Sequence, residues 1–325
     1  MFGNRTRSSE EREHLAAQIE RIYGLQAVHL TPTERGWYGE TWRVDHRQGR
    51  LFAKLVTYPP QQEHYRRSFS VLEYLRAKDM RDISRVVLAC NGALWAELTE
   101  GTLGLFHWVE GLHTEEYPLD QLFTRLCALY RVPTKGAPGM PREDYTMPYI
   151  DSVRSMALQA DAPIRAVLAS HRDRLTAYAA RLRAFAARCQ TDPGYLHITT
   201  GDVGGNVIMQ GTRMFIIDWD RPKLAPIERD LWFYMRLDSQ LRQIDQVLAR
   251  EGLPDRLSPQ RLAYYAYHRY FFYLQEYLGA YAALPDQRDD VLDALENFFS
   301  RGYWVNEAMA RADRLEPEEE GRPWI

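Results

Sequence analysis

Hydrophobic and polar positions in the N-terminal part of the chain follow first a helical and then a strand-like pattern. Apolar residues recur at helical spacing from Leu15 to Ile22, Ser8 with Glu11 can form a capping box, and Gly24 can end the helix. Short runs of β-forming residues then predict strands over residues 26–30, 40–45, 50–58, 86–90, 93–97 and 103–109. This part of the chain is therefore expected to form a small, mostly antiparallel sheet with helices on it.

From Leu119 onward the pattern becomes mainly helical. Leu122, Leu126 and Leu129 keep helical spacing, and a proline-rich loop follows over residues 133–148. Further helices are predicted over residues 151–159, 162–190 and 259–284, the last crowded with tyrosines that are expected to be core residues. The two halves together predict an α+β fold.

Composition narrows the classes of protein that fit this pattern. The chain has 325 residues, 45% hydrophobic and 26% charged, which suits a globular protein of two lobes. A formal net charge of −3 argues against nucleic-acid binding. The sequence shows neither a signal peptide nor an apolar run of membrane-spanning length, so we expect no membrane partner and a cytoplasmic location. The cysteines, Cys90, Cys127 and Cys189, lie far apart and are expected to be reduced.

The most informative stretch covers residues 197–220, HITTGDVGGNVIMQGTRMFIIDWD. Apolar runs at residues 207–209 and 214–217 predict a β-hairpin that brings its two ends together. Asp202 and Asn206 precede this hairpin and Asp218 follows it, so a carboxylate, an amide oxygen and a second carboxylate are expected around one small cavity. Oxygen ligands of this kind suit Mg²⁺, and a nearby carboxylate can take the proton of an attacking hydroxyl. This combination is typical of phosphoryl transfer.

The motif TTGDVGGN followed by IIDWD resembles the catalytic loop and metal motif of the aminoglycoside phosphotransferase and choline kinase family. The run IIDWDRPKLAPIERDLWF is most similar to its spectinomycin phosphotransferase branch. The resemblance implies a bilobal protein-kinase-like fold, with a nucleotide-binding lobe over residues 1–110 and a helical lobe over residues 111–325. It further implies that Asp202 is catalytic, that Asn206 and Asp218 bind Mg²⁺, and that Asp230 is structural.

The same resemblance implies a nucleotide site in the N-terminal lobe. Lys54, within the strand LFAKLV, corresponds to the lysine that contacts the α- and β-phosphates, and Gly36 and Gly39 lie in the turn that covers the phosphates. Phe106 would wall the base pocket, while main-chain groups of His107 and Val109 would bind the adenine. From the residues alone, an ordinary hairpin loop, an exposed strand lysine and a simple strand end remain alternatives.

Three departures from the family pattern are visible. Thr200 stands where the family usually has histidine, and the interval from Asp202 to Asn206 is one residue shorter than usual. Anchoring the loop on Asn206 would place the catalytic position at Gly201. Ser68 stands where a helix glutamate should pair with Lys54, flanked at imperfect spacing by Glu63 and Glu73, and the choice between these two stays open.

The sequence therefore predicts a kinase that moves the γ-phosphate of ATP or GTP, with Mg²⁺, to a hydroxyl of an aminoglycoside-like or other polar acceptor. A metabolite kinase for an amino alcohol, nucleoside or sugar is an alternative, and so is a catalytically impaired ligand-binding protein of the same fold. The oligomeric state is left open. In this family the acceptor pocket lies in the C-terminal helical part, where acidic residues could bind a cationic acceptor or form a solvated face: Glu276, Asp286, Asp289, Asp290, Asp293 and Glu296.

Overall fold

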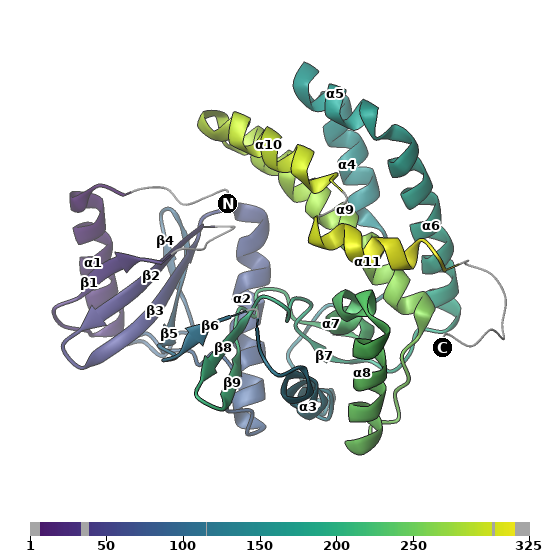
Figure 1. Ribbon diagram of the computed structural model, residues 1–325. Coiled ribbons are helices and arrows are strands. Elements are labelled where there is room, and N and C mark those ends of the chain that lie inside the picture. Colours follow the sequence, from purple (N-terminus) through teal and green to yellow (C-terminus); the bar gives the residue numbers. More distant parts are fainter. Residues whose placement is uncertain (1–6, 34–38, 115, 301–302, 316–325) are drawn as a thin grey trace. The chain divides into compact units, whose positions relative to one another are not determined.

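The computed structural model describes residues 7–33, 39–114, 116–300 and 303–315, and its elements are drawn in Figure 1. The chain divides into two compact units. Unit 1 comprises Met1–Pro118, Val132–Pro141 and Thr200–Lys223, and unit 2 comprises Leu119–Arg131, Arg142–Thr199 and Leu224–Ile325. This division differs from the expected one at residue 110, because the chain returns to unit 1 after leaving it, and the predicted lobe boundary stays a prediction.

Unit 1 is built on a five-stranded antiparallel sheet with the order β1-β2-β3-β5-β4. Its strands are β1 (His29–Pro32), β2 (Gly39–His46), β3 (Gly49–Val56), β4 (Ala96–Leu98) and β5 (Gly101–His107). The first helix, α1 (Ser9–Tyr23), has the predicted capping box at Ser8 and Glu11, and Gly24 ends it with a φ of 66°. A second helix, α2 (Pro59–Ala77), follows β3.

The two faces of this sheet are covered differently, with α1 on one side and α2 on the other (Figure 1). Alternating residues of β3, such as Ala53 and Leu55, pack with Leu15 and Ile19 of α1 in one buried cluster. The intervening residue Lys54 faces α2, because side chains alternate across a strand. The alternation thus places the only basic residue of the run LFAKLV on the α2 side.

The strand predicted over residues 86–90 does not form. Val87 donates to the Leu105 carbonyl and His107 to the Arg85 carbonyl, so this segment follows the end of β5, but its only bridge is Val86 to Phe106. The Cys90 amide donates instead to Ile22 at the end of α1, which draws the chain away from the sheet. The strand predicted over residues 93–97 forms only at its end, as β4.

A second, smaller sheet of unit 1 contains the predicted hairpin. Its strands are β6 (Leu112–His113), β8 (Val207–Gln210) and β9 (Arg213–Ile216), in the order β6-β8-β9. The hairpin is fixed to residues near the end of α2, since Ile216 donates to the Asp82 carbonyl and Arg213 pairs with the Asp82 carboxylate at 2.7 Å. The sequence-based prediction of this hairpin is confirmed.

Unit 2 is mainly helical. Its α-helices are α3 (Leu119–Tyr130), α4 (Pro148–Gln159), α5 (Ala162–Ser170), α6 (Arg172–Thr191), α7 (Glu228–Leu231), α8 (Asp238–Arg250), α9 (Pro259–Ala283), α10 (Arg288–Phe298) and α11 (Trp304–Ala312). Two 3-10 turns, η1 (Trp232–Arg236) and η2 (Pro285–Gln287), and a pair of short strands, β7 (His197–Thr199) and β10 (Lys223–Ala225), complete it. The single long helix predicted over residues 162–190 is wrong: His171 breaks it, with φ −113° and ψ 12°, and its ring stacks on Phe299.

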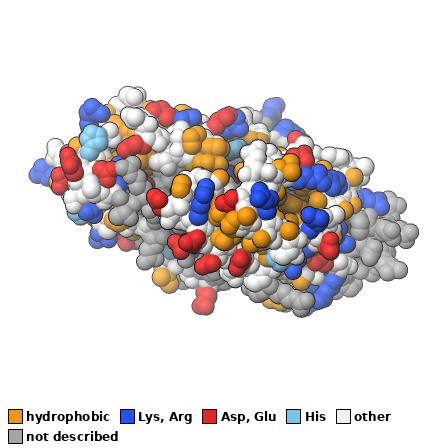
Figure 2. All heavy atoms as spheres, turned by 90° about the horizontal axis from the view of Figure 1, so that it is seen from above, with side chains coloured by type: hydrophobic (Ala, Val, Ile, Leu, Met, Phe, Trp, Pro, Cys, Tyr) orange, Lys and Arg blue, Asp and Glu red, His pale blue; other side chains and the backbone are white. Residues whose placement is uncertain are grey.

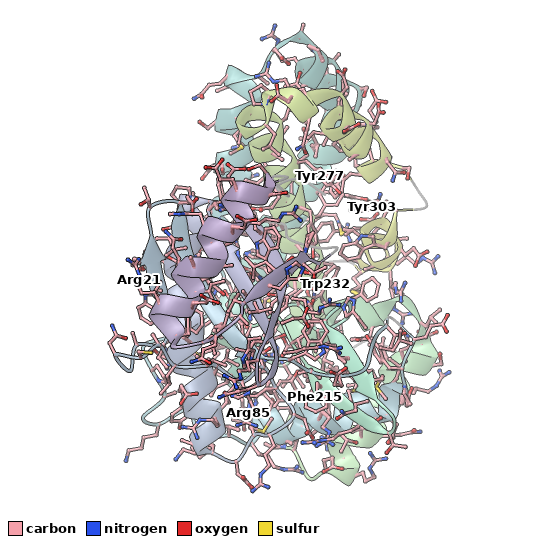
Figure 3. All side chains as sticks on the ribbon, turned by 90° about the vertical axis from the view of Figure 1, so that its left-hand side faces the viewer. Arg21, Arg85, Phe215, Trp232, Tyr277 and Tyr303 are labelled. Carbon is pink, nitrogen blue, oxygen red and sulfur yellow. The ribbon has the colours of Figure 1, made fainter. Side chains whose placement is uncertain are left out.

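The tyrosine-rich helix α9 forms the core of unit 2, as predicted. Tyr264, Tyr265, Tyr267 and Tyr270 are at most 1% exposed. Two of these hydroxyl groups form hydrogen bonds inside the core, since Tyr264 donates to the Thr146 carbonyl and Tyr265 to the Glu143 carboxylate. Further along α9, the hydroxyl of Tyr277 lies 2.7 Å from that of Tyr303, and both residues are labelled in Figure 3.

Two surface properties bear on the class of protein. On the face drawn in Figure 2, basic and acidic side chains are interspersed, as expected for a formal net charge of −3. Within the described ranges, no helix combines the length and the apolar character that crossing a membrane requires.

Candidate active site

The centre of the candidate site is an ion-pair cluster formed by Lys54, Asp218 and Asp220 within unit 1. The Lys54 ammonium lies 2.7 Å from Asp218 Oδ1 and 2.6 Å from Asp220 Oδ2. The lysine comes from β3 and the two carboxylates from the turn after β9, so segments more than 160 positions apart in sequence meet here. The Lys54 side chain is 11% exposed, against 41% for Asp218 and 18% for Asp220.

The electrostatics of this cluster follow from burial and mutual charge. Burial lowers the pKa of Lys54, but the two carboxylates raise it more, so its pKa lies above the ordinary value. Burial works to raise the pKa of Asp218, yet the charge of Lys54 and a hydrogen bond to Asp220 hold it below the ordinary value. Burial and the charge of Asp218 raise the pKa of Asp220 to about 7. One ammonium group cannot neutralise two carboxylates, so this cluster favours the binding of an additional cation.

The turn that carries the two carboxylates has an unusual backbone. Asp218 has a φ of 57°, in the left-handed region that non-glycine residues rarely adopt. Between the two acids, Trp219 is 2% exposed and its indole N–H donates to the Ile216 carbonyl at 3.0 Å. The buried tryptophan anchors the turn, and strain of this kind is common at functional sites.

The predicted catalytic loop follows β7 and is fixed by short hydrogen bonds. Asp202 is exposed, and its amide donates to the hydroxyl of the buried Thr200 at 3.2 Å. Asn206 Nδ2 donates to the Asp202 carbonyl at 2.7 Å, and the Ile217 amide donates to the Asn206 carbonyl at 2.9 Å. These bonds link Asn206 to Asp202, the predicted catalytic residue, on one side and to the residue before Asp218 on the other.

Side chains from β6 and from the segment after it contact the glycines of this loop. The Tyr117 hydroxyl donates to the Gly204 carbonyl at 2.6 Å, and His113 Nε2 lies 2.7 Å from the Gly205 carbonyl. Gly201, the alternative catalytic position, has a φ of 83° and is buried. Its backbone requires glycine, whereas the neighbouring Asp202 presents a carboxylate at the surface.

Of the two glycines predicted to border the phosphates, the structure describes only Gly39. Gly36 lies outside the described residues. Gly39 pairs with Val56, and a Cβ there would lie 1.9 Å from the Leu55 carbonyl, so this glycine is required by the sheet itself. Any role of Gly39 toward phosphates would be additional to that structural one.

The predicted hinge residues lie at the end of β5. Phe106 is 8% exposed and stacks on Phe69 of α2, with ring centroids 5.4 Å apart. The His107 amide already donates to the Arg85 carbonyl, so a base contact from His107 would use its own carbonyl. Val109 follows the strand end, where its main chain is outside the β5 ladder.

The open question of the partner of Lys54 has a clear answer in this structure. Glu63 pairs with Arg67 and Glu73 pairs with Arg76, while the Ser68 hydroxyl donates to the Tyr65 carbonyl. Among the described residues, the carboxylates that Lys54 contacts are those of Asp218 and Asp220. Sequence reasoning missed Asp220, although its spacing of two residues from Asp218 in IIDWD was a usable signal.

The donor set agrees with magnesium. Within the described residues, no three His, Cys, Asp or Glu side chains are grouped so that they could hold a metal by themselves. Asp218 and the amide oxygen of Asn206 nevertheless offer oxygen ligands, and Mg²⁺ is typically bound by one or two carboxylates together with waters and substrate phosphates. The residues present therefore fit this ion.

Downstream of the site, Asp230 belongs to the buried part of unit 2. It is 3% exposed and accepts a hydrogen bond from the Tyr130 hydroxyl at 3.2 Å. The preceding Arg229, also buried, donates to both the hydroxyl and the carbonyl of Thr199, directly before the predicted catalytic loop. This geometry supports the structural role expected for Asp230.

The antiparallel sheet with its buried strand lysine, the loop containing Gly204 and Gly205 and the DWD turn agree with the pattern of a kinase-like phosphotransferase. The model of the phosphotransferase enzyme family matches residues 29–270, and the chain belongs to this family. The predicted α+β fold, the family resemblance and the expectation of a kinase-type enzyme are thereby confirmed.

Solved structures extend the comparison of folds. The chain is similar to spectinomycin phosphotransferase APH(9)-Ia in complex with ADP and spectinomycin, at a TM-score of 0.70 and 18% identity, over 92% of this chain and 98% of that one. Macrolide 2'-phosphotransferase MphH from Brachybacterium faecium gives a TM-score of 0.57 at 16% identity, over 88% and 98%. A GDP complex of aminoglycoside 2'-phosphotransferase IIIa gives 0.60 at 16%, over 91% and 99%. A search of curated proteins by sequence found no match.

Proposed function

We propose that this protein is a small-molecule O-phosphotransferase that moves the γ-phosphate of ATP or GTP to a hydroxyl of a polar acceptor. The observation that carries the proposal is the meeting of Lys54 with Asp218 and Asp220 in the unit that also contains the Asp202–Asn206 loop. Lysine, metal-binding oxygens and a general base are the parts that phosphoryl transfer requires.

Each residue has a defined task in this proposal. Lys54 binds the α- and β-phosphates, and Asn206 and Asp218 hold Mg²⁺, which neutralises charge on the phosphates when bound. Asp202 accepts a hydrogen bond from the acceptor hydroxyl and takes its proton. The acceptor oxygen then forms a bond to the γ-phosphorus while the bond from that phosphorus to the bridging oxygen of the nucleotide breaks. The products are a phosphate ester and the nucleoside diphosphate.

The base of the nucleotide is proposed to lie against the end of β5. Phe106 would wall the base, the carbonyl of His107 and the amide of Val109 would bond it, and Gly36 and Gly39 would border the phosphates. Structures of similar fold contain ADP in one case and GDP in another, which supports a purine nucleotide without selecting between ATP and GTP.

The acceptor is proposed to be an aminoglycoside-like or other cationic, hydroxylated molecule, which would make antibiotic resistance one role of the enzyme. Support comes from the similar structure that binds spectinomycin and from one that binds streptomycin. Unit 2 also exposes an acidic helix, since Asp286, Asp289, Asp290, Asp293 and Glu296 are all exposed on or beside α10. Exposed carboxylates attract ammonium groups of an acceptor.

The test is nucleoside diphosphate release with Mg²⁺ and ATP or GTP, over a panel of aminoglycosides, amino alcohols, nucleosides and sugars, with a water-only background. We expect one acceptor class to raise the rate well above that background. Asp202→Asn is expected to lower turnover by about 10²–10⁴-fold with unchanged thermal stabilisation by Mg²⁺ and nucleotide. Asp218→Asn is expected to weaken that stabilisation, so that a higher Mg²⁺ concentration is needed to reach it.

Two outcomes would contradict the proposal. Full turnover by a folded Asp202→Asn variant would remove Asp202 from catalysis. Nucleotide binding without phosphorylation of any acceptor in the panel would instead favour the ligand-binding protein of the same fold.

A further inference from the structure

We propose that Asp220, and not a glutamate of α2, is the positioning residue that holds Lys54, so that Asp218 is available to the metal. This inference rests on the proposed function. The family motif gave no role to the Asp220 carboxylate, and this inference supplies one. It also explains how Lys54 can be positioned although Ser68 stands in place of the expected glutamate.

The space between Lys54 and α2 is filled by aromatic side chains. The Tyr65 ring centroid lies 5.8 Å from Lys54 Nζ, and the Tyr65 hydroxyl donates to the Lys54 carbonyl at 3.1 Å. Gly104, the β5 partner of Lys54, leaves room for Tyr65 and Phe69, which a Cβ at that position would approach to 2.3 Å. On the α2 side, Lys54 thus meets rings, and its charge is matched from the DWD turn.

The two carboxylates of that turn are not equivalent. Asp220 has the shorter contact to Lys54, 2.6 Å against 2.7 Å, but the more decisive difference is exposure, 18% against 41% for Asp218. Mg²⁺ gives up its waters reluctantly and requires access to solvent and phosphates. The more open Asp218 suits the hydrated ion, and the more enclosed Asp220 suits the ammonium.

A link from α2 to Asp220 completes the arrangement. Gln61, in the first turn of α2, is 3% exposed, and its side-chain oxygen accepts a hydrogen bond from Arg221 Nε at 3.2 Å. Arg221 directly follows Asp220. Helix α2 therefore positions Asp220, the partner of Lys54, indirectly through Gln61 and Arg221. A glutamate on the helix would instead contact the lysine directly. On nucleotide binding, Lys54 keeps Asp220 and exchanges Asp218 for phosphate oxygens.

The first experiment needs neither metal nor acceptor. An amine-reactive acylating reagent is applied to the metal-free protein, and labelling of Lys54 relative to Lys78 is measured by peptide mass spectrometry. Lys78 lies just after α2 and is an exposed internal standard. We expect Asp220→Asn to raise relative labelling of Lys54 about tenfold, because the shorter of the two hydrogen bonds that the ammonium donates is weakened. Asp220→Glu keeps the carboxylate and is expected to restore most of the protection.

The second experiment separates the two carboxylates. The Mg²⁺ concentration that gives half of the thermal stabilisation by ADP is compared for Asp220→Asn and Asp218→Asn. We expect a change within about twofold for Asp220→Asn and more than about tenfold for Asp218→Asn, because only the latter loses a charged ligand of the ion. If the proposed function is correct, Asp220→Asn also lowers kcat with little change in KM for the nucleotide.

Gln61→Met offers a variant outside the charged cluster. It removes the acceptor of Arg221 at similar volume, and we expect Lys54 labelling between those of wild type and Asp220→Asn. Equal Mg²⁺ dependence of the two Asp→Asn variants would make Asp220 a metal ligand and overturn the proposal. Unchanged labelling of Lys54 in a folded Asp220→Asn variant would overturn it as well. Because labelling and ADP stabilisation use no acceptor, a failure to find an acceptor affects the proposed function alone.

Discussion

Thr200 shows how one residue can depart from a family pattern and still serve the same loop. It is 3% exposed, and its hydroxyl accepts the amide of Asp202, two residues away. A short side chain that bonds the backbone two residues on stabilises a turn locally. The substitution of threonine for histidine therefore leaves the carboxylate of Asp202 on a fixed backbone.

This reading predicts the behaviour of two substitutions. Thr200→Val keeps the shape but removes the hydroxyl that accepts from the Asp202 amide, so we expect kcat to fall about tenfold, as for loss of one hydrogen bond of about 1.4 kcal/mol. Thr200→Ser keeps the hydroxyl and is expected to retain turnover within about twofold. Steady-state kinetics measures both, with circular dichroism as the control for folding. Equal losses in the two variants would contradict the role of the hydroxyl.

A second residue-scale prediction concerns the pH dependence of stability in unit 2. His197 lies 3.0 Å from Asp255 Oδ1 through Nε2 and 2.8 Å from the Tyr130 carbonyl through Nδ1. Burial lowers the pKa of His197, but the hydrogen bond and charge of Asp255 raise it more, so its pKa lies above 6.5. A raised pKa in the folded state contributes stability that is complete below pH 6.5 and is lost as the pH rises through the folded pKa.

The measurement is the free energy of unfolding by urea for wild type and His197→Gln from acidic to alkaline pH. We expect the difference between the two proteins to be largest below about pH 6.5 and to shrink above it. Asp255→Asn serves as a control that removes the cause of the raised pKa and is expected to flatten the wild-type profile. If the difference in unfolding free energy between wild type and His197→Gln instead grows with pH, the pKa of His197 is not raised in the folded protein.

Site residues that lie in a recognisable motif could be predicted from the sequence. Contacts that depend only on tertiary packing could not. The hairpin predicted that the ends around Asn206 and Asp218 would meet, and Lys54 was an unusual polar residue in an apolar strand. Nothing local in the sequence indicated that Lys54 would contact Asp220, since the two positions are 166 residues apart. The pairing is a consequence of how β9 is held beside Asp82 and Ile83.

At the scale of elements, the contact between α2 and β5 depends on one glycine. A Cβ on Gly104 would lie 2.3 Å from the Phe69 ring and 2.3 Å from the Tyr65 hydroxyl, and both of these side chains are fully enclosed. We expect Gly104→Ala to destabilise the protein by about 1–3 kcal/mol through overpacking. Thermal unfolding measures the loss, and lower turnover should accompany it because Tyr65 contacts Lys54.

The matched control is Gly139→Ala, since a Cβ on Gly139 would have no neighbour within 4 Å. We expect a change in stability of less than about 0.5 kcal/mol for this exposed loop position. If both variants unfold at the wild-type temperature, the close packing of α2 on β5 is not a source of stability.

Elements with local stop signals were predicted well, and those ended by tertiary contacts were not. The capping box of α1 and Gly24 fixed that helix from sequence, and the structure agrees. His171 carries no strong helix-breaking signal, and the break between α5 and α6 coincides with its stacking on Phe299, 128 positions further along the chain. Residues 86–90 have the composition of a strand, but the bond from Cys90 to Ile22 directs them elsewhere.

At the scale of the whole molecule, unit 1 is assembled from three separate stretches of chain. The segment Thr200–Lys223 supplies both carboxylates of the ion-pair cluster and the β8–β9 hairpin. That hairpin covers Ile83, which bridges to Ile216, and each of the two is 2% exposed. The N-terminal stretch therefore contains the lysine of the site but neither its partners nor all of its own core.

We accordingly expect a fragment of residues 1–110 to lack both nucleotide binding and cooperative unfolding. Without the hairpin, Ile83 would be exposed, and burial of one such side chain stabilises by roughly 1.5–3 kcal/mol. Calorimetry with Mg²⁺ and ADP and thermal unfolding by circular dichroism measure the two properties. The control is the full chain with Asp218→Asn and Asp220→Asn together, which keeps the hairpin and is expected to unfold cooperatively without binding Mg²⁺ and ADP. A fragment that unfolds cooperatively and binds ADP as the full chain does would show that the N-terminal stretch is an independent domain. The segment Thr200–Lys223 would then contribute residues to the site but nothing to the stability of unit 1.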